Sequence, residues 1–157
     1  MNEKNLVPFK RTYRKSDFGL TADVDLTQNK YVEIGSLTVP AQQQIAFGAN
    51  ENVTGRTQGV PIYIDVVDSN SAQISGVVRL IMTNANETNT QVVLEESIER
   101  LSASISDRTK AVLLPETNIR VGEDSKLKIQ FKADDASKTI QASNSATLFS
   151  VPVTVYQ

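Results

Sequence analysis

The chain has 157 residues and a formal net charge of −2, and it contains no His, Cys or Trp. This length suits one domain with its own hydrophobic core. The missing imidazole and thiol groups argue against catalysis by His or Cys, disulfide bonds and zinc held by its usual ligands. Ser, Thr, Asn and Gln form close to a third of the chain, and such residues suit exposed strand faces, turns and wet contacts with partners.

No segment holds the roughly 18 consecutive apolar residues that a membrane-spanning helix requires. The first residues, MNEKNLVPFKRTYRK, lack the apolar core of a secretory signal peptide. We therefore expect synthesis in the cytoplasm and no membrane insertion. No cofactor is predicted.

Charge is unevenly placed along the chain. Residues 1–15 hold five basic side chains and one acidic one, whereas the remaining residues hold 11 basic and 17 acidic groups. Because Pro8 and Gly19 interrupt any regular pattern, we interpret residues 1–20 as an extended basic N-terminal arm and 21–157 as one β-sandwich domain. The candidate partner-binding residues of the arm are Lys10, Arg11, Tyr13, Arg14 and Lys15.

Period-two alternation begins near Tyr31 and predicts a strand over 31–39, with a bulge or bend at Gly35. Residues 42–47 fit a short strand. The Gly- and Asn-rich stretch 48–59 is interpreted as a long surface loop.

Two strong strand patterns follow, 60–67 and 72–83, separated by the turn sequence DSNS. We expect them to form a β-hairpin. In the first, Ile62, Ile64 and Val66 share one face; in the second, Ile74, Val78, Leu80 and Met82 do.

Residues 90–95 fit a strand that runs into an ambiguous segment. Leu94, Ile98, Leu101 and Ile105 fall on one helical face, which predicts a short helix over 95–105. An irregular strand is the alternative, because Ser and β-branched residues lower helical propensity.

The C-terminal part alternates clearly. Short strands are expected at 110–115 and 118–121, and 126–133 should direct Leu127, Ile129 and Phe131 inward. The lysines on the other face of 126–133 are typical of a sheet edge that resists unwanted pairing. A short strand over 138–142 and a last strand with Val151, Val153 and Val155 in phase complete a set of eight to ten strands.

We predict an all-β, single-domain β-sandwich or jelly roll with at most one short helix.

Carboxylates occur in three clusters, each of which could bind a metal ion or form a turn. Asp65, Asp68 and Asn70 have spacing that would let them share a divalent cation, but turn chemistry at 68–70 and a solvent-facing Asp65 are the favoured interpretation. Glu123-Asp124 and Asp134-Asp135 fit solvated turns. No metal site is predicted.

Catalytic motifs are also weak. The one S-x-x-K match, Ser125 to Lys128, lacks its usual companion motifs and lies in an alternating strand. There is no P-loop, nucleophile elbow or G-x-G-x-x-G. Glycosylation sequons occur at Asn52 and Asn86, but two chance matches are expected in a chain so rich in Asn, Ser and Thr. We predict no catalytic residues and no enzyme activity. A cleft holding two carboxylates with shifted pKa values would revive the enzyme hypothesis.

Three interpretations of the arm stay open. It contacts packaged nucleic acid, it lies along an acidic neighbouring subunit, or it is a solvated tail. Nucleic acid is the less favoured partner, because five cations are few and the acidic body would repel it.

The basic arm, the short polar strands and the long loops together resemble small virion structural proteins, namely single jelly-roll capsid subunits and the β-sandwich decoration proteins of tailed phages. The resemblance implies a homo-oligomeric shell component of a virus particle, which binds copies of itself and other virion proteins through edge strands, loops and the arm. The alternatives are a capsid decoration or cement protein and a host-surface or glycan-binding β-sandwich module.

Overall fold

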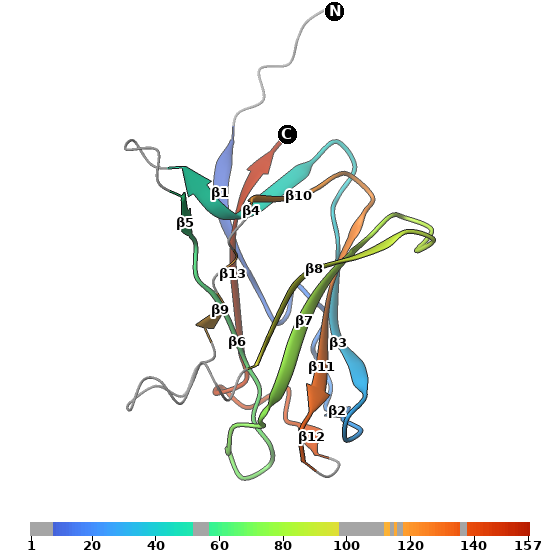
Figure 1. Ribbon diagram of the computed structural model, residues 1–157, viewed down its shortest axis with the longest axis vertical. Helices are drawn as coiled ribbons and strands as arrows, with labels where there is room; N and C mark the ends of the chain where they lie inside the picture. Colours follow the sequence, from blue (N-terminus) through green and yellow to red (C-terminus); the bar gives the residue numbers. More distant parts are fainter. Residues whose placement is uncertain (1–7, 52–56, 98–111, 114, 116–117, 136–137) are drawn as a thin grey trace, which may run out of the picture.

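The computed structural model describes residues 8–51, 57–97, 112–113, 115, 118–135 and 138–157. These residues form thirteen strands and no helix (Figure 1), and none of their elements is a helix long and apolar enough to cross a membrane. The all-β prediction is confirmed. Of the helix expected over 95–105, residues 95–97 belong to a strand, and the rest of that range lies outside the described residues.

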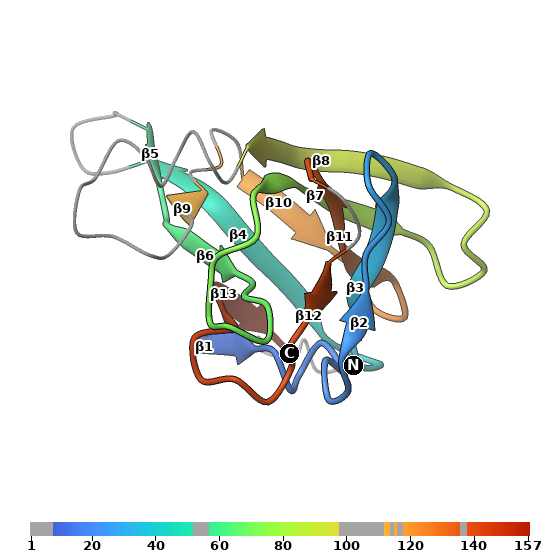
Figure 2. The same ribbon diagram turned by 90° about the horizontal axis from the view of Figure 1, so that it is seen from below.

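Two larger sheets face each other (Figures 1 and 2). The seven-stranded sheet has the order β10-β4-β13-β6-β9, with β1 added beside β13 and β5 beside β4. Its strands are β1 (Phe9–Arg14), β4 (Gln44–Glu51), β5 (Thr57–Gly59), β6 (Ile62–Asp65), β9 (Val112–Leu113), β10 (Asn118–Val121) and β13 (Leu148–Tyr156).

The four-stranded sheet has the order β3-β11-β7-β8, and a separate two-stranded sheet pairs β12 with β2. All strand pairs are antiparallel. The strands are β2 (Val24–Asp25), β3 (Tyr31–Thr38), β7 (Gly76–Thr83), β8 (Thr90–Ser97), β11 (Lys126–Ala133) and β12 (Thr139–Ile140).

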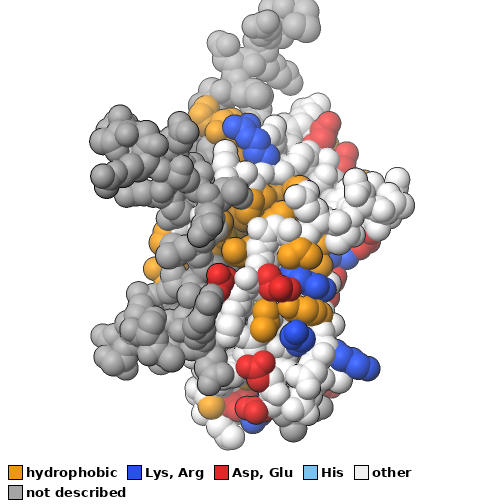
Figure 3. Space-filling model, in the orientation of Figure 1, with side chains coloured by type: hydrophobic (Ala, Val, Ile, Leu, Met, Phe, Trp, Pro, Cys, Tyr) orange, Lys and Arg blue, Asp and Glu red, His pale blue; other side chains and the backbone are white. Residues whose placement is uncertain are grey.

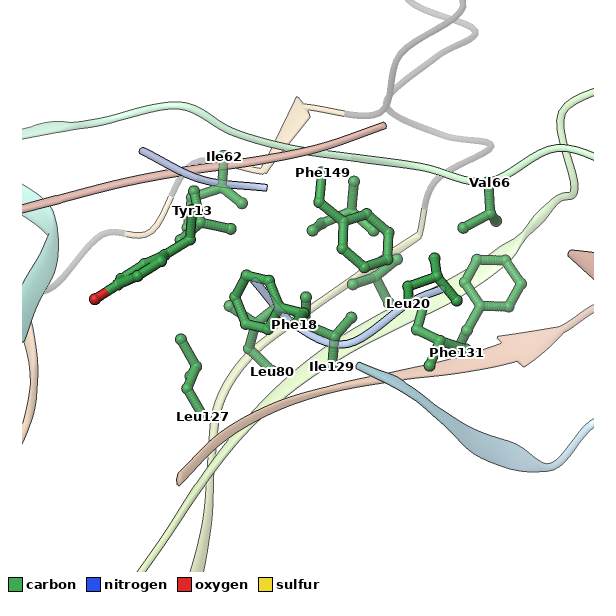
Figure 4. Close-up of a cluster of buried hydrophobic side chains, with 14 of the residues drawn as sticks. Tyr13, Phe18, Leu20, Ile62, Val66, Leu80, Leu127, Ile129, Phe131 and Phe149 are labelled. Carbon is green, nitrogen blue, oxygen red and sulfur yellow. The ribbon is translucent and has the colours of Figure 1, made fainter. Parts of the chain in front are cut away.

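The core fills the space between the two larger sheets (Figure 4). Alternation along β11 and β13 places every second side chain there, as the sequence predicted. The buried residues of these two strands are Leu127, Ile129, Phe131, Ala133, Phe149, Val151, Val153 and Val155. The edge interpretation of the lysine face is wrong, however, because β11 lies between β3 and β7.

The prediction that 60–67 and 72–83 form a β-hairpin is also wrong. The chain does turn at 68–71, where Ile74 N donates to Val66 O over 3.0 Å and Val67 bridges Gln73. Beyond that bridge the strands separate, because β6 pairs with β13 and β9 while β7 joins the opposite sheet beside β11. Their apolar faces therefore meet across the core instead of lying side by side.

The N-terminal segment is part of the sandwich, which moves the domain boundary expected at residue 20. Strand β1 pairs with β13 from Phe9 opposite Val155 to Arg14 opposite Ser150. Phe18 and Leu20 then enter the core, with 2% and 4% of their surface exposed. Apolar burial explains the difference, because Tyr13, Phe18 and Leu20 all place their side chains in the core.

The structure also tests the bulge predicted near Gly35 and the loop predicted over 48–59. The bulge predicted near Gly35 is present: Ile129 lies opposite Gly35 and Gln130 opposite Glu33, which leaves Ile34 as the extra residue. The loop expected over 48–59 is partly strand, because β4 continues to Glu51 and pairs with β5.

Candidate functional site

The five residues predicted to bind a partner lie on β1 and in the turn that follows it. The structure divides them into two groups. Lys10, Arg11 and Arg14 are exposed, whereas Tyr13 is buried and Lys15 is partly buried.

Tyr13 serves the core of its own domain. Its side chain is 3% exposed, and its ring meets that of Phe18 edge-on with 6.3 Å between the centroids. Burial raises the pKa of the Tyr13 hydroxyl. This residue therefore holds β1 onto the sandwich.

Lys15 also makes internal contacts. Its Nζ donates to the carbonyl oxygens of Ala142 at 2.6 Å and Asn144 at 2.9 Å. Because the carbonyls belong to the segment before β13, Lys15 ties the end of the N-terminal segment to the C-terminal part of the chain.

Asp17 organises the end of β1. Its Oδ2 accepts the backbone N–H of Arg14 at 2.8 Å, and its Oδ1 lies 3.3 Å from Nη2 of Arg11. The Arg11 guanidinium also lies over the Tyr13 ring, 4.8 Å from its centroid. The outward charge of β1 is thus carried by Lys10, Arg11 and Arg14.

A second exposed strand, β8, was not singled out from the sequence. It lies at the end of the four-stranded sheet, and Val92 near its start is 47% exposed. Glu95 further along β8 is exposed as well. The sequence did carry a signal for this exposed strand. The segment TQVVLEES has no basic residue, and its two adjacent valines cannot both face the core.

The outer face of the four-stranded sheet carries an ordered polar network. Arg79 donates from Nε and Nη2 to Oε1 of Gln130 at 3.0 and 2.6 Å, and its guanidinium lies 3.7 Å from the centroid of the Tyr31 ring. The Tyr31 hydroxyl donates to Glu95 Oε2 at 2.6 Å. Burial, together with this hydrogen bond, raises the pKa of Tyr31 to about 12.

Ion pairs extend this face along β11. Lys128 pairs with Glu33 of β3 at 3.1 Å and also with Glu87 of the β7–β8 loop, and Lys126 reaches Glu87 at 3.1 Å. Hydrogen bonds from the two lysines lower the pKa of Glu87. Basic, acidic and apolar side chains are consequently interleaved on this face (Figure 3).

Asp68 organises a turn. Asp68 Oδ1 accepts the backbone N–H groups of Asn70 at 2.8 Å and Ala72 at 3.1 Å, as expected for turn chemistry. Asp65, expected to face solvent, is instead buried with 1% of its surface exposed. Across the described ranges, no three Asp or Glu residues gather in a way that would hold a metal ion.

Lys128 of the S-x-x-K match is engaged by Glu33 and Glu87 on the outer face, as the alternating strand predicted. The sequon at Asn52 lies outside the described residues.

A hollow of about 240 Å³ opens on the seven-stranded sheet. It is smaller than a typical small-molecule site. Its lining residues contain no carboxylate: Lys10, Arg11, Thr12, Ala46, Phe47, Gly48, Val60, Asn118, Pro152, Val153, Thr154 and Tyr156. The paired acids that a glycosidase requires are therefore not found in it.

The sequence matches no protein-family model and no curated protein. Solved structures do match. One is a complex of VP16 and VP17, the two major capsid proteins of bacteriophage P23-77, with a TM-score of 0.62 and 8% identity over 95% of this chain and 98% of that chain. Another is VP17, a capsid protein of the same phage, with a TM-score of 0.60 and 9% identity over 97% of both chains. The chain therefore has the fold of these capsid proteins, in agreement with the predicted resemblance to single jelly-roll subunits, while it shares little of their sequence.

Proposed function

We propose that this chain is a structural subunit of a virus particle, a capsid shell protein that associates with copies of itself and with other virion proteins. The observation that carries the proposal is the agreement in fold over nearly the whole length of both this chain and one chain of a complex of two major capsid proteins. The two chains thus correspond over nearly their whole length.

The distribution of side chains supports the same function. The polar groups of the outer face pair with one another, and the charged side chains of β1 are exposed. This arrangement offers surface for association. We infer that the protein is not an enzyme, that it is made in the host cytoplasm and that it resides in the virion.

Purified protein should form oligomers whose mass rises with concentration. Light scattering after size exclusion measures that mass, and electron microscopy shows whether rings, sheets or shells form. A chain that remains monomeric up to millimolar concentration would contradict the proposal.

A glycan-binding module is the second candidate. The observation that favours it is the hollow on the seven-stranded sheet, which combines the Tyr156 ring with the polar groups of Thr12, Asn118 and Thr154. A glycan array separates the two functions: specific binding that Tyr156→Ala abolishes would favour the module, and no binding would leave the shell subunit.

A further inference from the structure

Two strand edges differ from the others in one respect. Each carries an exposed large hydrophobic side chain, Phe9 on β1 with 39% exposure and Val92 on β8 with 47% exposure, and these are the two such side chains of the described residues. Exposed apolar groups on a strand edge favour pairing with another chain. We call these edges the β1 edge and the β8 edge.

The β1 edge presents main-chain groups. The N–H of Arg14 bonds to the Asp17 carboxylate, so it points away from β13. Donors and acceptors alternate in direction along a strand, and the main-chain groups of Lys10 and Thr12 therefore point the same way as those of Arg14. Asp17 closes this edge at one end, and along 9–12 the edge has no strand partner within the described parts of the chain.

The β8 edge also presents main-chain groups to the outside of its sheet. One side of β8 pairs with β7 along its whole length, and along 91–95 the other side has no strand partner among the residues that the structure describes. A register shift at Val93 places Val92 opposite Ile81 and Leu94 opposite Leu80.

The two edges have opposite charge. Strand β1 holds Lys10, Arg11 and Arg14 and no acid, whereas β8 holds Glu95 and Glu96 and no base. Pairing two β1 edges would bring the exposed Lys10 and Arg14 of both copies together, and pairing two β8 edges would bring their exposed Glu95 carboxylates together. Only the mixed pair is attractive.

We propose that the β1 edge of one copy pairs with the β8 edge of the next copy, which extends a sheet from subunit to subunit. This inference rests on the proposed function and names the surface through which the subunits associate. Such a contact joins two different surfaces, so each copy keeps one free β1 edge and one free β8 edge. Head-to-tail contacts of this kind build rings or rows.

The test uses charge variants of the two exposed side chains in the full chain. Phe9→Glu places an acid opposite the acidic edge, and Val92→Lys places a base opposite the basic edge, so each should weaken self-association at least tenfold. Phe9→Lys and Val92→Glu, the matched controls, should weaken it less. An equimolar mixture of Phe9→Glu and Val92→Lys should associate into pairs, because the intact β8 edge of the first variant meets the intact β1 edge of the second.

Thr12→Pro gives an independent test. It removes an N–H that points away from β13, so the fold should keep its thermal unfolding midpoint while self-association falls. Arg11→Pro is the control that should lower that midpoint, because the Arg11 N–H points toward β13.

Other outcomes overturn the inference. Pairing of two β1 edges would make Phe9→Glu strengthen assembly, and unchanged assembly in Phe9→Glu, Val92→Lys and Thr12→Pro would exclude both edges. In either case a wild-type chain that assembles keeps the proposed function. A wild-type chain that stays monomeric overturns the two together.

Discussion

The ring of Phe18 lies edge-on to the ring of Phe149, with 6.1 Å between the ring centroids and 75° between the planes. Phe18 follows β1, and Phe149 lies in β13 at the other end of the chain. The contact thus joins the N-terminal segment to the centre of the core.

Phe18→Ala should lower the free energy of unfolding by about 3–5 kcal/mol, because it removes a ring that is 98% buried and leaves a cavity. Phe9→Ala, at an exposed position on the same segment, is the control and should change it by less than about 1 kcal/mol. Urea unfolding measures both. A cost for Phe18→Ala no larger than that of the control would show that residues 16–20 are not part of the core.

Gly76→Ala should be strongly destabilising. A Cβ at this position would lie 2.3 Å from the backbone oxygen of Lys132 and 2.7 Å from Cε1 of Phe131, so β7 and β11 would have to separate. We expect a loss of about 1–3 kcal/mol. Gly122→Ala has no atom within 4 Å of its new methyl group and should be neutral or slightly stabilising. Equal thermal midpoints for the two variants would contradict the close packing of β7 on β11.

Lys15→Met should lower stability by about 1–3 kcal/mol, because two carbonyl oxygens lose a charged donor. Lys10→Met should leave the unfolding midpoint unchanged and weaken self-association instead. Chemical unfolding and light scattering on the same samples separate these effects. If Lys15→Met changed assembly and left stability intact, its place among the internal contacts would be wrong.

The folded chain should lose stability as the pH rises from 10 to 12. Tyr31 has a pKa of about 12 in the folded chain against 10.0 in the unfolded chain, so folding favours its protonated form. Its contribution is complete below pH 10 and declines as the pH rises toward 12. Tyr31→Phe should flatten this part of the pH profile of the unfolding free energy. The same slope in both proteins would show that Tyr31 is not the titrating group.

The sequence predicted the strands whose pattern is local. In β11 and β13 the alternation of apolar and polar residues specified which side chains are buried, because successive side chains of any strand point to opposite faces. Ile129 and Val153 are buried for this reason. The Gly35 bulge was likewise visible as a glycine that interrupts a period-two run.

The sequence could not specify strand partners. The patterns of β6 and β7 fit a hairpin and two strands of opposite sheets equally well, because alternation records which face of a strand is apolar and not which strand lies beside it. The choice depends on β13 and β11, which lie far away in the chain and supply the hydrogen-bonding edges.

The candidate site also combines features that the sequence predicted with features that only the tertiary structure determined. Composition alone revealed the cations of the N-terminal segment and the absence of imidazole and thiol. Only the tertiary structure decided that Tyr13 turns into the core, that Lys15 binds carbonyl groups near β13, and that β8 lies at the end of the four-stranded sheet. The physical reason is that charge is a property of each residue, whereas exposure depends on contacts between distant parts of the chain.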